Sequence, residues 1–276
     1  PHWKYTPAGI DFDTSLIELI EDAEGAKRTF KLNAKPKSNV IVTIKSDHND
    51  RLSISSSSLT FTSSNWNTDQ TVIFTAIDDH IANGDLDFSI TINSSSGDSR
   101  FNDIKNTVQV KIKDNDDVGI IYDDSSIILN EGQSVVRTFK LKSQPLADVV
   151  LNISSDHDDK LTISSKQLIF TSSNWNINQS VTFTAIDDNI ASGDLSFNIK
   201  IKSSSTDVLY NNIPENVIPI TIKDDDLAGI IYDSTSVILN EGQSITRTFK
   251  LKSQPTSDVT LNISSNNSSR ISISKS

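Results

Sequence analysis

The chain has 276 residues, no cysteine, and 36 acidic against 25 basic side chains, which gives a net charge of −11. This balance argues against a nucleic-acid partner, which needs clustered cations, and the lack of cysteine excludes disulfides and thiolate sites. No apolar run approaches the roughly 18–20 residues that span a bilayer. The chain begins at Pro1 without any methionine, which indicates a processed or excised piece. The acidic, Ser/Thr/Asn-rich composition is typical of an extracellular or cell-surface bacterial protein.

Whole segments of the sequence recur. The motif "ILNEGQS" is found at 128–134 and again at 238–244, and "SSNWN" is found at 63–67 and again at 172–176. A period of about 110 residues has the size of a domain, not of a solenoid turn. We therefore divide the chain into an N-terminal lead-in, two full units and a third that stops near its midpoint: 1–8, 9–117, 118–226 and 227–276.

In the second unit the hydrophobic period is two, as in "RTFKL" and "SVTFTAI", which predicts half-buried antiparallel strands. No stretch shows a helical period. A short extra strand at 160–164 would disturb the alternation of strand directions. Seven strands in about 110 residues predict an all-β fold of tandem immunoglobulin-like sandwiches. In chain order, we expect strands at 119–129, 135–143, 148–155, 167–172, 179–186, 195–203 and 217–224.

Acidic residues follow every second predicted strand. Because successive strands alternate in direction, the first, third, fifth and seventh strands end at one pole of the sandwich. In the second unit, the acids after these strands are Glu131, Asp156, Asp158, Asp159, Asp187, Asp188, Asp194, Asp224, Asp225 and Asp226. The first unit has Asp78, Asp79, Asp85, Asp114, Asp116 and Asp117, with Asp22 and Glu24 in an altered first connection. The third unit keeps Glu241 but has Asn266, Ser268 and Ser269 after its third strand.

So many carboxylates at one pole oppose each other's ionisation. A solvated acidic loop would explain one such cluster, but several clusters at one pole, repeated in a second copy, favour a divalent cation. Ca²⁺ takes six to eight oxygen ligands from flexible loops. The apolar run after Asp117 begins the next unit almost at once. We therefore expect Ca²⁺ at the junctions, where it would couple neighbouring units. Further candidate ligands are Asp22, Glu24, Asp156, Asp158, Asp159 and Glu241.

The chain resembles the Calx-β domain family, whose tandem sandwiches occur in sodium–calcium exchangers and in large bacterial surface proteins. The resemblance rests on "NEGQS", on "LIFTSSNWNINQSVTFTAIDDNIASGD" and on "ITIKDDDLAGI". It implies Ca²⁺ held by the glutamate after the first strand, the loop acids after the fifth strand and the terminal aspartates. The sequence departs from the exchanger-type pattern in "NIASGD" and "HIANGD", which carry only Asp194 and Asp85.

The tryptophans, the histidines and the lack of catalytic motifs bear on the remaining functional classes. Trp66 and Trp175 are expected to close the sandwiches as core residues, and His48, His80 and His157 to be solvated loop residues instead of zinc ligands. No catalytic motif is present, so we expect no enzyme. The favoured function is a Ca²⁺-stiffened stalk or adhesin module whose partners are other repeats of the same protein. The alternative is recognition of a surface glycan or protein receptor by the loops at the other pole. The third unit would be completed in a longer chain, or by another copy in a homo-oligomer or filament.

Overall fold

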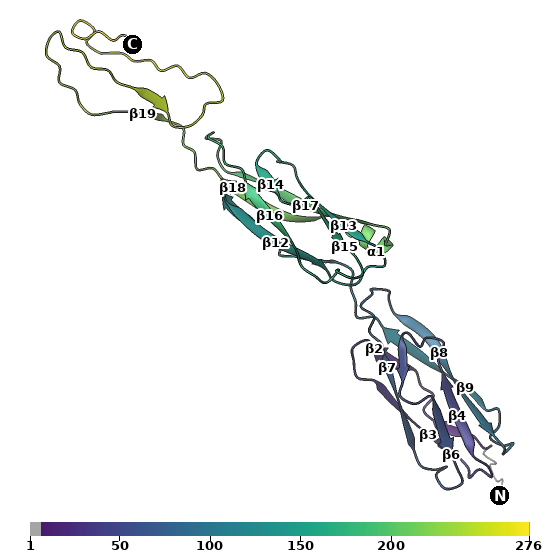
Figure 1. Ribbon diagram of the computed structural model, residues 1–276. Helices are drawn as coiled ribbons and strands as arrows, with labels where there is room; N and C mark the ends of the chain where they lie inside the picture. The colour runs from purple at the N-terminus through teal and green to yellow at the C-terminus, as the bar shows by residue number, and fades with distance from the viewer. Residues whose placement is uncertain (1–6, 276) are drawn as a thin grey trace.

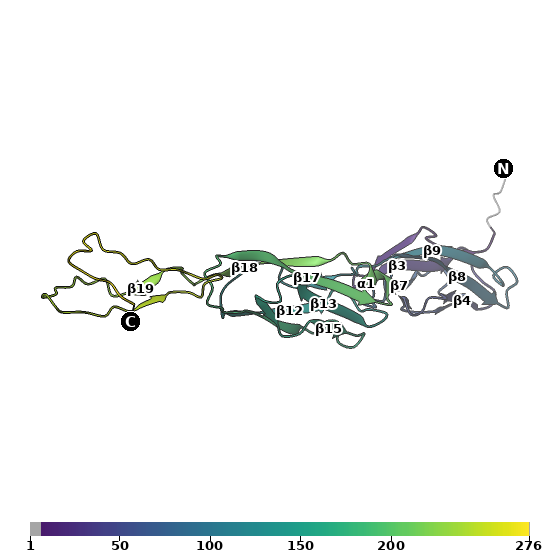
Figure 2. The ribbon, with the colours of Figure 1, turned by 90° about the horizontal axis from the view of Figure 1, so that it is seen from above.

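The structure, a computed structural model, describes residues 7–275 as two complete β-sandwiches and a third, partly formed unit arranged in a row (Figure 1). The turned view shows the same succession of units with short connections between them (Figure 2). The predicted all-β, tandem immunoglobulin-like fold is confirmed. Within residues 7–275, no helix is both long enough and apolar enough for a membrane crossing.

The first sandwich consists of a four-stranded sheet, in the order β1-β3-β7-β5, and a five-stranded sheet, in the order β2-β9-β8-β4-β6. Alternate residues of each strand face the space between the sheets; in β4, for example, Val40, Val42 and Ile44 are buried. The strands are β1 (Ile10–Phe12), β2 (Ile17–Ile20), β3 (Ala26–Leu32), β4 (Val40–Lys45), β5 (Leu52–Ile54), β6 (Ser58–Phe61), β7 (Gln70–Ala76), β8 (Leu86–Ser96) and β9 (Lys105–Lys113).

The second sandwich repeats this arrangement, with sheets in the orders β10-β12-β16-β14 and β11-β18-β17-β13-β15. Its core contains Phe139, Phe170 and Phe183, and Trp175 packs against that core while remaining partly buried, as expected. The strands are β10 (Ile120–Ile121), β11 (Ile127–Asn130), β12 (Ser134–Leu141), β13 (Val149–Ser155), β14 (Leu161–Ile163), β15 (Gln167–Phe170), β16 (Gln179–Ala185), β17 (Leu195–Ser205) and β18 (Asn216–Lys223).

The single strand predicted at 119–129 is two strands in different sheets. β10 pairs with β12 in one sheet, and β11 pairs in parallel with β18 in the other. The polar residues 123–126 between them carry no strand. Because β12 and β18 belong to different sheets, β10 and β11 lie in opposite layers of the sandwich. The sequence shows only two apolar stretches close together, which a prediction joins into one strand.

The predicted extra strand at 160–164 exists as β14, but it does not disturb the alternation of directions. β14 runs antiparallel to β16, and β15 runs antiparallel to β13. Since β13 and β16 run the same way, β14 and β15 also share one direction, and together they form one strand that changes sheets. The strands β11, β13, β16 and β18 therefore all end at the same pole.

The second sandwich also contains a single helical turn, α1 (Val208–Asn211), although the sequence shows no helical period. A side-chain oxygen of Asp207 accepts a hydrogen bond from Leu209 N at 3.0 Å and caps the turn. Tyr210 is buried, and its hydroxyl donates to the Ser143 carbonyl at 2.6 Å. One turn is too short to produce a periodic pattern, so only its cap and its buried tyrosine mark it.

The third unit has two short strands among the described residues, β19 (Ile230–Tyr232) and β20 (Phe249–Leu251). They pair antiparallel, and the Tyr232 and Phe249 rings stack with centroids 5.7 Å apart. The same pair of rings occurs in the second sandwich as Tyr122 and Phe139. The third unit thus repeats the beginning of the second.

Candidate metal centre

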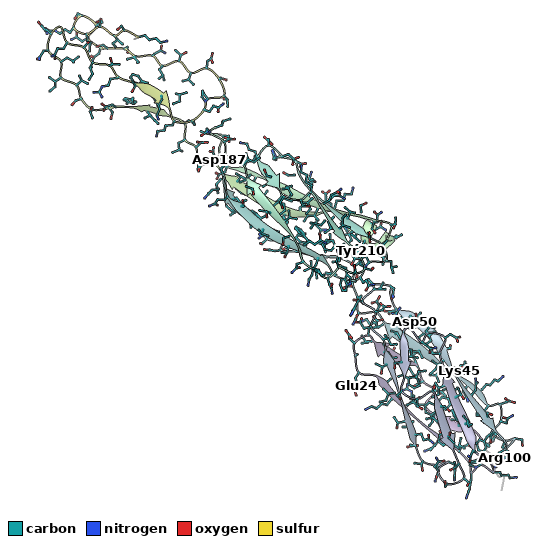
Figure 3. The ribbon with its side chains drawn as sticks, viewed as in Figure 1. Glu24, Lys45, Asp50, Arg100, Asp187 and Tyr210 are labelled. Carbon is teal, nitrogen blue, oxygen red and sulfur yellow. The ribbon has the colours of Figure 1, made fainter. Side chains whose placement is uncertain are left out.

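The acidic residues that follow β2, β7 and β9 in the first sandwich, and β11, β16 and β18 in the second, gather at the end that faces the following unit. Figure 3 shows Asp50 and Asp187 at these ends of the first and second sandwich, and Arg100 at the opposite end of the first. We call the end of the first sandwich formed by residues 21, 78–85 and 114–117 the first acidic pole. The second acidic pole is the matching end of the second sandwich, formed by residues 131, 187–194 and 224–226.

At the first acidic pole, Glu21 follows β2, and Asp114 and Asp116 follow β9. The parallel pairing of β2 with β9 brings these chain ends side by side. One carboxylate oxygen from each of these three residues lies within 4.8 Å of the other two, and a second group joins Asp78, His80 and Asp116 in the same way. Glu21 is almost fully buried.

The backbone of the first pole is held by Asp114, which accepts hydrogen bonds from Gly84 N at 2.5 Å and Asp116 N at 2.8 Å. Asp114 thereby ties the loop after β7 to the residues after β9. Asp116 Oδ2 is buried without a hydrogen-bond partner among residues 7–275. Burial, followed by the charges of Asp78 and Asp114, raises the pKa of the Asp116 carboxyl.

At the second acidic pole, Glu131, Asp225 and Asp226 each contribute one carboxylate oxygen to a group within 4.8 Å. Glu131 is 8% exposed, and its Oε2, like Asp226 Oδ2, is buried without a hydrogen-bond partner in the part of the chain that the structure describes. Burial raises the pKa of both carboxyls; at Asp226 the charges of Asp224 and Asp225 add to it. Two buried carboxylate oxygens that lack hydrogen-bond partners are an unstable arrangement without a cation.

Asp224 plays the same backbone role as Asp114. Its carboxylate accepts hydrogen bonds from Gly193 N and, at 2.9 Å, from Asp226 N. These backbone donors hold the pKa of the Asp224 carboxyl below its usual value. Gly193 has φ +82°, in the left-handed region that favours glycine, so the loop can bring its N–H to the carboxylate.

The loop before β5 in the first pole, and before β14 in the second, contributes a basic side chain that sequence reasoning did not single out. Arg51 Nη2 lies 2.8 Å from Glu21 Oε1, and Arg51 Nε lies 3.4 Å from Asp79 Oδ2. In the second pole Lys160 Nζ pairs with Asp188 and lowers the pKa of that carboxyl. Neither residue carries a motif, and their proximity to the acids follows from the loop that joins β4 to β5 and β13 to β14.

Glu21 is the residue that the prediction for the first pole missed. Asp22 lies in a turn with φ +59°, and Glu24 has an 89% exposed side chain that pairs with Lys27 at 3.8 Å. The converging group of the first pole contains Glu21 and neither of the two candidates from "IEDAEG". The alternation of buried Ile17, Leu19 and Glu21, repeated as Ile127, Leu129 and Glu131, is the sequence signal that identifies it.

Several other predicted ligands lie outside the groups of converging oxygens. Asp85 and Asp194 accept the N–H of Asp114 and Asp224, respectively, and pair with a lysine on the adjoining strand. Asp156 and Asp158 pair with Lys200 and Lys166. The remaining predicted ligands that fall outside these groups are Asp224, which accepts backbone hydrogen bonds, Asp79 and Asp188, which pair with Arg51 and Lys160, and the exposed residues Asp117, Asp159, Asp187 and Glu241.

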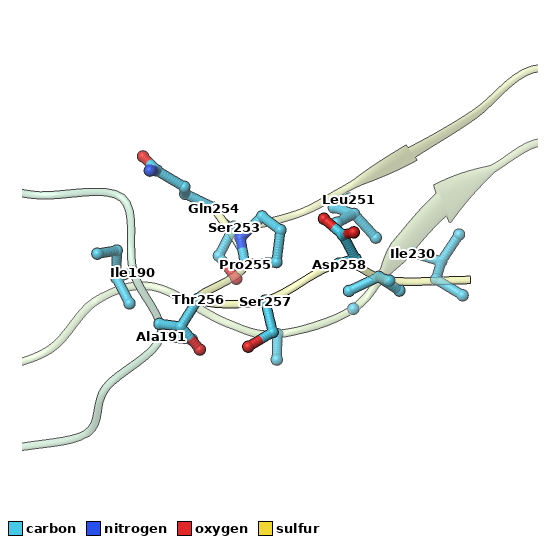
Figure 4. A pocket seen from close by; sticks show the side chains of 13 residues that line it. Ile190, Ala191, Ile230, Leu251, Ser253, Gln254, Pro255, Thr256, Ser257 and Asp258 are labelled. Carbon is cyan, nitrogen blue, oxygen red and sulfur yellow. The ribbon is translucent and has the colours of Figure 1, made fainter. Parts of the chain in front are cut away.

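The loop that carries the acids also contacts the following unit. Gln144 N donates to the His80 carbonyl at 2.7 Å, and the His80 and Trp175 rings have centroids 6.1 Å apart. At the next junction Gln254 N donates to the Asn189 carbonyl at 2.6 Å. There Ile190 and Ala191 face Gln254, Pro255 and Thr256 across a cavity (Figure 4). A cation bound at either pole would lie beside a contact between units.

The donors at both poles fit a hard cation. They are carboxylate oxygens with additional backbone and amide oxygens nearby, which is the ligand set that Ca²⁺ and Mg²⁺ take. The Asp78, His80 and Asp116 group adds one nitrogen donor at the first pole only, because Asn189 replaces the histidine in the second. The unpartnered oxygens of Asp116, Glu131 and Asp226 are the atoms that a bound cation would satisfy.

No family model and no curated relative matches the chain. Among solved structures, it is similar to the calcium binding domain CBD12 of CALX1.1 at 14% identity, covering 71% of this chain and 80% of that one, with a TM-score of 0.36. CBD12 from CALX1.2 matches at 14% identity over 78% and 99% of the two chains, with a TM-score of 0.33. The extracellular cadherin domains 1–5 of protocadherin gamma B2 match at 12% identity over 87% and 46%, with a TM-score of 0.33. At these scores and identities the likenesses assign no function.

Proposed function

We propose that the chain is a row of Ca²⁺-binding structural modules in which the ions bind at the acidic poles and stiffen the junctions between neighbouring sandwiches. The observation that carries the proposal is the set of buried carboxylate oxygens without partners: Asp116 Oδ2, Glu131 Oε2 and Asp226 Oδ2. The residue that carries each of these oxygens belongs to a group of three side chains whose ligand atoms converge within 4.8 Å. A divalent cation removes both the repulsion and the missing partners at once.

Placement supports the structural role. The loop that carries Asp78 also carries His80, whose carbonyl and ring contact the second sandwich. Ordering this loop around a cation would therefore fix the surface on which the next unit rests. With an acidic, cysteine-free composition and tandem copies, this favours a stalk or adhesin at the surface of a bacterial cell, with other repeats as partners and no enzymatic activity.

The alternative, recognition of a glycan or protein receptor by the loops opposite the acidic pole, requires those loops to be accessible. In the second sandwich they are engaged, because Gln144 and Trp175 contact the first sandwich. No contact among residues 7–275 favours that alternative. Completion of the third unit by another copy, as in a filament, is likewise a proposal, which light scattering at high concentration tests: a monomer at all concentrations would argue against it.

Thermal unfolding in excess Ca²⁺ and in EDTA tests the main proposal. A ligand that binds only the folded protein stabilises it by RT ln(1 + [L]/Kd), about 2.7 kcal/mol at a hundredfold excess over Kd. We expect both complete sandwiches to melt at higher temperature in Ca²⁺. Sodium chloride at the same ionic strength controls for salt screening, because Mg²⁺ takes the same kind of oxygen ligands as Ca²⁺. Superimposable melting curves in Ca²⁺ and EDTA would refute the proposal.

A further inference from the structure

A basic residue occupies the same place in each of the three units. Arg51, Lys160 and Arg270 each come directly before the strand-like segments "LSIS", "LTIS" and "ISIS". In the two complete sandwiches this place lies inside the acidic pole, as the ion pairs of Arg51 and Lys160 show. The repeated position suggests a common role, but the contacts of the two side chains differ.

In the first pole Arg51 holds the buried glutamate. Its Nη2 lies 2.8 Å from Glu21 Oε1, and its Nη1 donates to Asn83 Oδ1 at 3.0 Å. The Arg51 side chain is 11% exposed and that of Glu21 is 0% exposed, so this pair is removed from solvent. The guanidinium cannot lose its charge at accessible pH. Glu21 is therefore neutralised from within the chain.

In the second pole the buried glutamate is left without such a partner. Lys160 Nζ pairs with Asp188, and Glu131 Oε2 has no hydrogen-bond partner among the described residues. Lysine carries its charge at one point, whereas the planar guanidinium of arginine donates in several directions at once. Arg51 can thus contact a glutamate and an aspartate directly in the first pole, while the only ion pair of Lys160 among the described residues is with Asp188 and its effect on Glu131 is that of a nearby charge.

We propose that Arg51 is a tethered counter-ion that competes with the divalent cation for Glu21, so that the second acidic pole binds its cation more tightly than the first. This inference rests on the proposed function and adds to it a determinant of affinity. For Glu21 to become a ligand, Arg51 must give up its bonds to Glu21 and Asn83, and its positive charge must move away from the incoming ion. At Glu131 no ion pair among the described residues has to be broken, and Lys160 acts on that carboxylate only through its nearby charge.

A tryptophan at the first junction, Trp175, allows ion binding at the first pole to be followed by fluorescence. Trp175 of the second sandwich lies against His80, whose Nδ1 is 2.7 Å from Asp78 Oδ2 in the first pole. Tb³⁺ takes oxygen ligands as Ca²⁺ does and emits when a nearby tryptophan is excited. Tb³⁺ at the first pole should therefore be sensitised by Trp175, and the part of the signal lost in Trp175→Phe identifies that pole.

The experiment titrates Tb³⁺ into the full chain and into Arg51→Gln, Arg51→Lys and Lys27→Gln. We expect Arg51→Gln to lower the half-saturating Tb³⁺ concentration at the first pole by about tenfold or more, because a nearby positive charge has been removed. The half-saturating concentration of Arg51→Lys should lie between those of the original chain and Arg51→Gln, because a lysine would keep the positive charge and an ion pair with one aspartate. Lys27→Gln removes a charge from the exposed Lys27–Glu24 pair of the same sandwich and should change little.

A purely structural role for Arg51 gives the opposite sign: weaker or unchanged binding in Arg51→Gln, which overturns the inference while the proposed function stands. Equal tightening in Lys27→Gln also overturns it, since the effect would then be one of net charge. If Arg51→Gln does not fold, Arg51→Lys decides by the same criterion. Absence of binding in the full chain and in every variant overturns the inference and the proposed function together.

Discussion

The two acidic poles have the same strand order and the same backbone anchors, yet their buried glutamates differ. Glu21 is paired with Arg51, whereas Glu131 keeps one oxygen without a partner. Asp114 and Asp224 tie the loops together in the same way in both poles. Two copies of one fold can thus share the backbone of a binding site and still differ in the site itself. A single side chain on a neighbouring loop determines how many carboxylate oxygens remain available to a cation.

The sharpest test of this difference is Glu131→Gln. In Ca²⁺ at a hundredfold excess over Kd, the second sandwich should lose most of the about 2.7 kcal/mol that the cation contributes. In EDTA the variant should be more stable than the original by about 1 kcal/mol, since a buried carboxylate without a partner is removed. Melting followed by Trp175 fluorescence in both solutions measures the two effects. Glu215→Gln, on an exposed residue of the same sandwich, is the control.

The corresponding change in the first pole, Glu21→Gln, should act with the opposite sign in EDTA. It leaves the Arg51 charge buried without its glutamate, and removing one partner of a buried pair costs about 3–5 kcal/mol. Arg51 keeps Asp79 and Asn83, so we expect a loss of about 2 kcal/mol from the first sandwich. Denaturant unfolding in a Trp175→Phe background, followed by Trp66, measures it against Glu18→Gln on the exposed face of β2. Equal EDTA effects of Glu21→Gln and Glu131→Gln would contradict the comparison.

Lowering the pH should bring a smaller change. Burial raises the pKa of the Glu131 carboxyl above its ordinary value of 4.5, so the metal-free native state holds this proton more firmly than the unfolded chain. Glu131 therefore stabilises the native state least when the pH is above its raised pKa, and more as the pH is lowered through that pKa. In EDTA, the melting temperature of the original chain should approach that of Glu131→Gln as pH decreases from 7 toward 5. A gap that stays constant over this range would contradict the assignment.

The smallest expected effect concerns the junction contacts. His80→Asn gives the first junction the residue that the second has in Asn189 and removes the ring contact with Trp175, while the carbonyl that accepts from Gln144 remains. Stability should change by no more than about 0.5 kcal/mol, but the two sandwiches should reorient more freely. Nuclear magnetic relaxation of the two sandwiches measures this, with His157→Asn, whose ring contacts Phe197 of its own sandwich, as the control. Unchanged relative tumbling would show that the ring contact does not restrict the joint.

Much of the fold could be predicted because its elements depend on local pattern. Alternation such as Val40, Val42 and Ile44 specifies strands, and the repeat assigns them to copies of one sandwich. The break between β10 and β11 could not be predicted in this way, because it depends on which distant strand pairs with each half. The single turn α1 was missed for a different reason: four residues are too few for a period, and its signal is the cap Asp207.

The candidate site could be predicted as far as strand direction determines it. Direction alone brings Glu131, Asp225 and Asp226 to one end of the sandwich, and the structure finds them within reach of one ion. Strand direction does not determine which carboxylates point toward the common site and which pair with a lysine instead. Asp194, for example, pairs with Lys223 at 2.5 Å. The partnership of Arg51 with Glu21 joins residues 30 positions apart on separate loops, and no period or motif in one sequence reports such a contact.

The parallel pairing of β11 with β18 has a mechanical consequence. The chain reaches β11 from the preceding unit at one end of the sandwich and leaves β18 for the following unit at the other end. A pull along the row therefore drags these two neighbouring strands past each other, and the ladder from Ile127 opposite Ile220 to Asn130 opposite Lys223 is loaded in shear. The ladder bonds share such a load and must break together, whereas a hairpin pulled from one end opens one bond at a time. The same arrangement in β2 and β9 would let the whole row transmit tension.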